Sequence, residues 1–310
     1  IWSFNTFITP IFPNNLKINF TYKTSNSSQK NLTFTSDAFG NTGNPNSTYE
    51  TKVLTRPSFF VSGDIIPKLA KPDSSATQAK EISESFENNF VKFPFPSWTL
   101  NLTGVEKFDL FTGFASSMTI ESGYNSEYKK TLTLDGRSPE IISNQSLSSG
   151  FSPLIGVNIN FKPISEGNLT AAIKINKGDN YNLEPSNGRI TNTATSDFSI
   201  NASYAKTGFK IPLFGLSLEN NFTVSFSYTV TKNEPLIYTY NSSTGIWEQV
   251  AQTGATTTTT INPSIQYNLS RSVVLQLFYK YNKIEPTGGT LGITTRTSNE
   301  AGLNIKLQIQ

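Results

Sequence analysis

The chain has 310 residues and a net charge of +3, and only 15% of its residues are charged. It contains neither Cys nor His, which excludes thiol nucleophiles, disulfides, thiolate metal sites and histidine general bases. The weak charge argues against a nucleic-acid partner. We therefore expect no cofactor, no metal site and no enzymatic activity, although carboxylate chemistry stays open. With 23 Phe and 12 Tyr, the composition favours strands with one apolar and one uncharged polar face over a disordered chain.

The sequence of residues 1–94 predicts weak strands and a long loop region. We expect the loop region on the extracellular side of a membrane. Leu16, Ile18, Phe20 and Tyr22 alternate well with polar residues. From Asp37 to Phe95 several prolines argue against central strands, so a long loop is expected there. Within it, Ala76–Phe90 predicts a short helix.

Residues 95–310 predict regular strand hairpins, because apolar and polar residues alternate with a period of two. The pattern is clearest from Phe222 to Val230, and it recurs up to the last predicted strand, Ala301–Ile309. The better strands run about 9–11 residues, the length of a tilted transmembrane strand. No apolar run approaches the roughly 20 residues of a membrane helix, so any membrane crossing is expected to use strands.

The predicted connections alternate between short and long. Asn268–Ser272 predicts a tight turn, and Lys162–Asn168 and Ala205–Ser217 predict compact connections. Four stretches predict extended polar loops: Asn125–Gly150, Lys177–Ser196, Thr231–Thr256 and Lys283–Ser298. Short periplasmic turns and long outer loops are typical of outer-membrane barrels, so we expect the C-terminus on the periplasmic side.

The sequence thus predicts an all-β fold, an antiparallel transmembrane β-barrel of about 12–14 strands in which residues 1–310 form one segment. A soluble β-sandwich also alternates and is the less favoured alternative. Aromatic residues near the predicted strand ends favour the membrane, because barrels carry aromatic girdles there. The residues expected to face lipid are Phe222, Val224, Phe226, Tyr228, Leu275, Leu277, Tyr279, Leu303, Ile305 and Leu307.

Charged residues offer two further hypotheses. Lys162, Lys174 and Lys306 fall on the polar face, where ordinary solvation of a lumen is favoured over contact with a partner. A glycosidase-like acid pair is the second hypothesis, for four carboxylates whose spacing does not demand it, so that surface charge is favoured: Glu121, Glu127, Asp135 and Glu140.

Several phrases, in order along residues 95–310, are similar to the C-terminal part of the SprA/Sov family, the outer-membrane translocon of the type IX secretion system. The segment Phe151–Asn158 is the most characteristic of them. The others are Pro96–Leu100 with Gly104, Asn168–Thr170, Ser196–Phe198, Lys210–Leu213, Asn268–Arg271 and Leu277–Tyr279.

This resemblance implies a segment of a much larger barrel, since proteins of that family are several times longer and outer-membrane barrels reach about 36 strands. It implies a conduit that exports cell-surface and gliding-motility proteins across the outer membrane. The implied partners are cargo proteins with C-terminal signal domains, a shuttle barrel, periplasmic plug subunits and the lipid bilayer. The alternative is a self-contained, porin-like channel, and a soluble surface protein is a third hypothesis.

Overall fold

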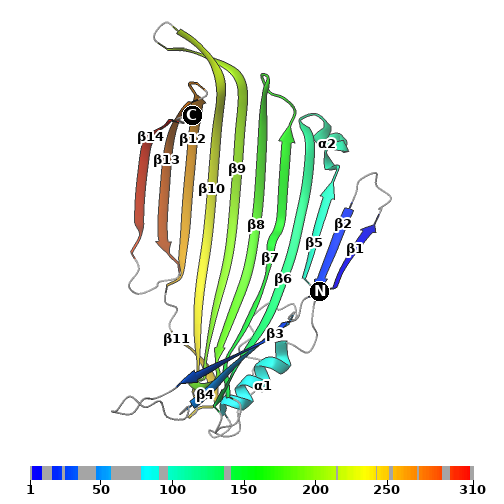
Figure 1. The fold of residues 1–310 in the computed structure, drawn as a ribbon, viewed down its shortest axis with the longest axis vertical. Coiled ribbons are helices and arrows are strands. Elements are labelled where there is room, and N and C mark those ends of the chain that lie inside the picture. The colour runs from blue at the N-terminus through cyan, green and yellow to red at the C-terminus, as the bar shows by residue number, and fades with distance from the viewer. Residues whose placement is uncertain are drawn as a thin grey trace.

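The computed structural model describes residues 2–8, 16–22, 25–33, 47–56, 78–90, 97–135, 141–213, 216–241, 243–250, 254–270, 272–287 and 294–307. Most of them belong to one antiparallel sheet (Figure 1). The strands are β1 Trp2–Ile8, β2 Leu16–Tyr22, β3 Ser25–Thr33, β4 Ser47–Arg56, β5 Ser97–Thr103, β6 Ala115–Asp135, β7 Ile141–Phe161, β8 Gly167–Glu184, β9 Arg189–Leu213, β10 Leu216–Asn241, β11 Ile246–Val250, β12 Thr256–Asn268, β13 Val273–Pro286 and β14 Arg296–Leu307. The helices are α1 Gln78–Phe90 and α2 Asp109–Thr112, with 3-10 turns at Val105–Lys107 and Pro185–Asn187.

The hydrogen-bonded path through the sheet is β1-β2-β5-β6-β7-β8-β9-β10-β12-β13-β14, and each neighbouring pair is antiparallel. Sequential neighbours joined by turns form this kind of up-and-down wall. Figure 1 shows the wall as a row of near-parallel ribbons, with β1 at one edge and β14 at the other. Among the described strands, β14 pairs with β13 and β1 pairs with β2, and no pairing joins β1 to β14.

The strands β6–β10 are much longer than the sequence predicts. β9 has 25 residues and β10 has 26, where 9–11 were expected. At about 3.3 Å per residue, a strand of this length spans roughly 85 Å, far more than a bilayer requires. On the side away from the tight turns, the strands β6–β10 continue past five residues: Tyr124, Phe151, Lys177, Ser196 and Lys232. We call these parts of the five strands the extension.

Three of the four predicted polar loops are therefore wrong over most of their length. β6 and β7 occupy most of Asn125–Gly150, β8 and β9 occupy most of Lys177–Ser196, and β10 and β11 occupy much of Thr231–Thr256. The fourth, Lys283–Ser298, is shortened at both ends by β13 and β14. The compact connection expected at Ala205–Ser217 is also largely strand, since β9 runs to Leu213 and β10 begins at Leu216.

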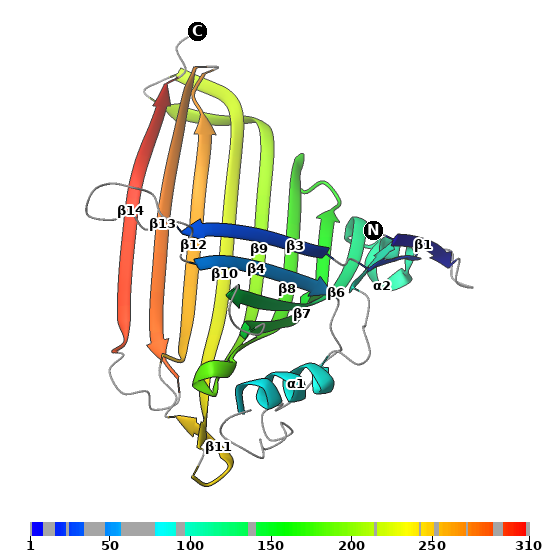
Figure 2. The ribbon, with the colours of Figure 1, turned by 60° about the horizontal axis from the view of Figure 1, so that its bottom comes forward.

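The loop region predicted from Asp37 to Phe95 is wrong over one segment and right about the helix within it. Ser47–Arg56 forms β4, which pairs with β3 and with the extension of β6. The predicted helix is confirmed over Gln78–Phe90, and the rest of that stretch lies outside the described residues. Because β5 pairs with Thr119–Tyr124 and β4 with Tyr128–Asp135, the sheet branches at β6. Figure 2 shows the β3–β4 hairpin, in blue, running across the direction of β12–β14, while β4 lies antiparallel to the extension of β6.

Helix α1 packs on the extension, and the helix and the strands together enclose a small apolar core. Ile82 and Phe86, one helical turn apart, are almost fully buried, as expected for the apolar stripe of an amphipathic helix. They contact a cluster of buried strand residues: Tyr128, Leu147, Tyr181, Leu183, Ile190 and Tyr238. Gln145 Nε2 donates to Tyr128 Oη at 2.6 Å and to the Ser83 carbonyl at 3.3 Å, which fixes the helix against β6 and β7.

Bulges mark the point where the extension leaves the rest of the wall. The β6–β7 register shifts between Glu121 and Tyr124, and the β7–β8 register shifts between Phe151 and Ile155. Ser122 Oγ donates to the Leu154 carbonyl at 2.7 Å, so the irregular backbone still has a polar partner. Because bulges bend a strand and increase its twist, they redirect the sheet at this level.

Candidate functional site

All ten residues predicted to face lipid lie on one face of the sheet. Residues directly opposite each other in an antiparallel pair share a face. The ladder joins Phe222 to Tyr267, Tyr267 to Leu275 and Leu275 to Ile305, and the alternation along each strand adds the remaining members. We call this side the apolar face and the opposite side the polar face. That the apolar face contacts lipid stays a prediction.

Large apolar side chains on this face are exposed to the surroundings of the protein. Leu277 is 55% exposed and Phe226 is 40% exposed, although both lie in the middle of their strands. Others of the same face are also exposed: Ile155, Ile173, Ile175, Ile265, Tyr279, Leu303, Ile305 and Leu307. An exposed apolar surface of this extent is typical of an interaction site, and here it runs along the wall from β7 to β14.

Aromatic rings cluster at both ends of this exposed apolar stretch. At the tight-turn end, Phe209 stacks on Phe222 with centroids 4.6 Å apart, and Phe114 lies 5.8 Å from Phe161. At the other end, Phe151 contacts Trp98 and Tyr124, with centroid distances of 6.3 and 5.2 Å, and Phe198 lies 6.3 Å from Tyr228. Two such clusters are what the aromatic girdles of an outer-membrane barrel produce.

The same face is covered by protein once it enters the extension. Tyr181 and Leu183 continue the face that carries Ile173 and Ile175 along β8, yet they are 3% and 0% exposed because α1 packs over them. An apolar face in water is stabilised by such a cover, whereas one in lipid needs none. The change from exposed to helix-covered side chains therefore marks where the bilayer is expected to end.

Several amide and hydroxyl groups on the polar face hydrogen-bond to one another. Asn160 Nδ2 donates to Ser117 Oγ at 2.7 Å, and Asn282 Nδ2 donates to Thr260 Oγ1 at 3.2 Å. The Ser203 and Ser225 hydroxyls lie 3.4 Å apart. Small uncharged groups of this kind are solvated by water, and they attract neither positively nor negatively charged molecules strongly.

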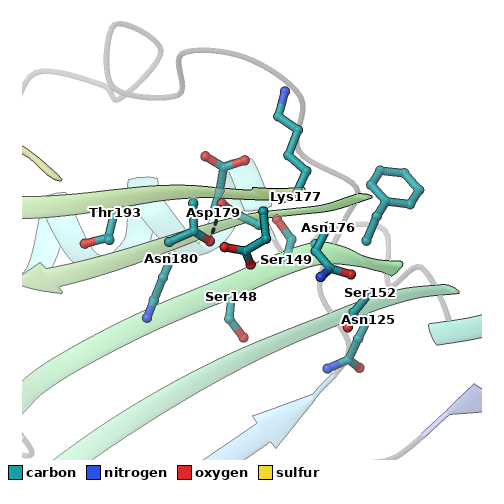
Figure 3. A pocket seen from close by; sticks show the side chains of 14 residues that line it. Asn125, Ser148, Ser149, Ser152, Asn176, Lys177, Asp179, Asn180 and Thr193 are labelled. Atoms are coloured by element: carbon teal, nitrogen blue, oxygen red, sulfur yellow. Dashed lines mark hydrogen bonds between the residues drawn. The ribbon is translucent and has the colours of Figure 1, made fainter. Parts of the chain in front are cut away.

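Two shallow hollows lie on the polar face. One is lined by two successive rows of polar side chains on β7–β10 and β12, among them Asn158, Asn201, Ser203, Ser227 and Asn262. The other lies where Gly150 pairs with Gly178, because neither glycine has a side chain to fill the surface at that point. Figure 3 shows amide and hydroxyl groups from β6–β9 around this second hollow, with Lys177 pointing away from Asn176 and Asn180.

The charges near the polar face are few, and one close pair crosses a strand. Lys174 Nζ on β8 lies 2.7 Å from Glu121 Oε1 on β6, above Gly156 of the intervening β7. Lys174, predicted to lie on the polar face, is thus paired with the carboxylate of Glu121. Lys162 lies in the β7–β8 turn and Lys306 lies on β14, and both are exposed. In the extension, burial raises the pKa of the Asp179 carboxyl above its ordinary value, while Lys177 acts in the opposite direction.

The four carboxylates considered as an acid pair do not come together. Glu121, Glu127 and Asp135 follow one another along β6, and Glu140 lies outside the described residues. Glu121 and Glu127 are six positions apart along the strand, which separates them by roughly 20 Å, well beyond the spacing of a glycosidase pair. Glu127 and Asp135 lie in a strand, and not in the loop expected over Asn125–Gly150. Among the described residues, no group of three or more acidic side chains is placed to hold a metal ion.

Two features of the site were not predicted from the sequence. Glu121 and Lys174 are far apart in the chain, and only the register across β7 shows that they meet above a glycine. The helix-covered core was missed because its members are separated by polar residues in stretches rich in Asn and Ser. The alternation of apolar and polar residues around Tyr181, Leu183 and Ile190 was the signal that could have revealed this core.

In the part of the chain that the structure describes, no helix has the length and apolar character needed to cross a membrane. A comparison with curated proteins gives no match. A family model described as Gram-negative porin matches residues 131–286, just over half of the chain, from the extension of β6 to the end of β13. The chain therefore belongs to the Gram-negative porin family and is an outer-membrane protein with an antiparallel β-barrel fold.

Proposed function

We propose that this chain forms part of the wall of an outer-membrane protein-export conduit, the translocon of a type IX secretion system. The observation that carries the proposal is the polar face, a broad surface of small, mostly uncharged side chains, several of which hydrogen-bond to one another. A strongly charged wall would hold cargo of opposite charge and repel the rest. A wall of amides and hydroxyls suits the passage of many different folded proteins.

The phrases that resemble the SprA/Sov family support the proposal by their position. The Phe151–Asn158 segment contains the bulge where β7 leaves the extension, and Ser196–Phe198 is where β9 does the same. Asn168–Thr170 begins the transmembrane part of β8, and Leu277–Tyr279 lies in the exposed apolar part of β13. These four phrases thus lie at the places where strands leave the extension or in the parts of strands that form the wall.

The partners of this conduit are part of the proposal. Cargo proteins with C-terminal signal domains would pass along the polar face. A shuttle barrel would receive them, and periplasmic plug subunits would close the conduit between export events. The extension, expected on the cell surface because it lies opposite the tight turns, would stand where cargo leaves.

A self-contained, porin-like channel is the second candidate, and the family match to residues 131–286 favours it. Both candidates are non-enzymatic, in keeping with the family. They differ in what passes through. A channel of a dozen strands admits small solutes, whereas an export conduit must admit a folded domain.

Depletion of the natural full-length protein distinguishes the two. We expect proteins with the C-terminal signal to accumulate in the periplasm while uptake of small sugars stays unchanged. Complementation with Gln276→Arg, on the polar face, should restore release, and Leu275→Arg, on the apolar face, should not. Normal cargo release with reduced sugar uptake would overturn the export proposal and favour the channel.

A further inference from the structure

Two charged side chains interrupt the apolar face of strand β8. The residues on that face are uncharged over Leu169–Ile175, and from Tyr181 onward they lie beneath α1. Between these two parts stand Lys177 and Asp179, which share the face because strand residues two positions apart point the same way. Figure 3 shows Lys177 pointing away from Asn176, its neighbour on the polar face. The two charges therefore lie at the level where the exposed apolar surface ends and the helix-covered core begins.

Strands β10 and β13 repeat this order, in which a lysine is followed, two residues further from the tight turns, by a carboxylate. On β10, Lys232 and Glu234 follow the alternating stretch Phe222–Val230, and Lys232 Nζ lies 2.7 Å from Glu234 Oε1. On β13, Lys283 Nζ lies 2.6 Å from Glu285 Oε1. Each ion pair lies on the apolar face, in phase with the apolar residues of its strand. We call the three pairs, on β8, β10 and β13, the charged belt.

Two lysines of the charged belt flank a single residue of the strand between them. Ser196 of β9 is paired with Lys177 on one side and with Lys232 on the other. Because neighbouring strands are about 4.8 Å apart, the backbones of the two lysines are separated by roughly 10 Å. Ser196 is exposed, and its short side chain leaves the space between the two longer ones open. Two ammonium groups and one hydroxyl group thus border the same small area of the apolar face.

Phosphate is the chemical group that suits this set of donors. Hydrogen bonds from an ammonium group to a phosphate oxygen are short and strong, and a serine hydroxyl can donate a further one. An ammonium group has three N–H donors, so the contact of Lys232 with Glu234 leaves others for a second anion. A lysine at the edge of a lipid-facing surface lays its stem along apolar groups and extends its ammonium group to the headgroups. The phosphates present at that level belong to the lipids.

We propose that the charged belt binds the phosphate group of a membrane lipid, held over Ser196 between Lys177 and Lys232, while the acyl chains of the lipid cover Ile173 and Ile175. The carboxylates of the belt offset the charge of its lysines, so contact between acyl chains and apolar side chains supplies the rest of the affinity. Because the extension is expected on the cell surface, the lipid belongs to the outer leaflet. The inference depends on lipid contact by the apolar face, and not on what passes along the polar face.

Retention of defined lipids by the natural full-length protein tests the inference. The protein is reconstituted in phosphatidylcholine vesicles that contain equal amounts of phosphatidic acid and of diacylglycerol with the same acyl chains. After extraction in mild detergent, mass spectrometry measures how much of each lipid the protein retains. The variants are Lys177→Gln, Lys232→Gln and Glu234→Gln. Lys280→Gln is the matched control, because it removes a lysine from the polar face of β13, and heat-modifiable migration checks that each variant is folded.

We expect the unmodified protein to retain phosphatidic acid in preference to diacylglycerol. The preference should fall about five-fold for Lys177→Gln and for Lys232→Gln, the attraction that one lysine adds near an anionic membrane surface. Glu234→Gln should raise it, because the carboxylate repels the phosphate, whereas Lys280→Gln should leave it unchanged. Equal retention of the two lipids, or an equal loss for Lys280→Gln and Lys232→Gln, would overturn the inference. Release of phosphatidic acid by millimolar inorganic phosphate would also overturn it, because the site would then bind phosphate without a lipid.

Discussion

Glu121 and Lys174 form an ion pair across a strand that lies between them. The carboxylate is on β6 and the ammonium group on β8, 2.7 Å apart, and Gly156 of β7 lies beneath. A Cβ atom at Gly156 would lie 2.6 Å from Glu121 Cγ and 2.9 Å from Pro153 Cγ. The glycine therefore provides the space in which the two side chains meet.

Replacing Gly156 with Ala should disturb this arrangement. We expect the free energy of unfolding to fall by about 1–3 kcal/mol, the usual cost of adding a methyl group to a packed site. Urea unfolding in lipid vesicles measures it. Gly113→Ala is the control, because a Cβ there meets nothing within 4 Å. Equal stability of the two variants would show that the side chains do not need the space.

The two faces of β13 should respond differently to charge. Leu275→Arg places a charge on the apolar face, at a cost of roughly 2–4 kcal/mol if the residue lies near the membrane midplane. Gln276→Arg places it on the polar face, where water solvates it. We expect the first variant to be depleted from the outer-membrane fraction and the second to assemble normally. Equal assembly of both would remove the assignment of the faces.

The helix-covered core should be separable from the membrane wall. Phe86 is 0% exposed, so Phe86→Ala should cost about 3–5 kcal/mol in the extension, since it leaves a cavity between α1 and the strands. Hydrogen exchange should accelerate at Tyr181 and Leu183 but not at Ile173. Glu84→Ala, on the exposed side of α1, is the matched control and should change neither.

The alternating faces could be predicted from the sequence, and the length of the strands could not. Phe222–Val230 alternates between apolar and polar residues, which indicates a strand whatever surrounds it. In the extension, residues such as Asn180 and Asn182 have the composition of a loop, yet Asn182 Oδ1 accepts a hydrogen bond at 2.8 Å from Asn144 Nδ2 on the neighbouring strand β7. Local propensity does not report such partners, because the two residues are 38 positions apart in the chain.

Asp179 should make the stability of the extension depend on pH. Because burial raises the pKa of its carboxyl above the ordinary 3.8, the ionised form destabilises the folded state. This loss develops as the pH rises from 3.8 through the higher folded pKa, and it is absent below 3.8.

Asp179→Asn should therefore raise the midpoint of thermal unfolding of the extension at pH 7 and leave it unchanged near pH 3. Asn180→Ala, which carries no titratable group, should shift the midpoint equally at both pH values. A gain for Asp179→Asn that is the same at both would contradict the assigned cause.

A cysteine scan of residues 273–282 tests the central claim, that this sheet is a membrane wall with one lipid face and one aqueous face. The 310 residues contain no cysteine, so each introduced thiol reports alone within them. In intact outer membranes, a charged maleimide should label positions 274, 276, 278, 280 and 282 and spare 273, 275, 277, 279 and 281. Uniform labelling, or labelling of the odd positions instead, would contradict the account.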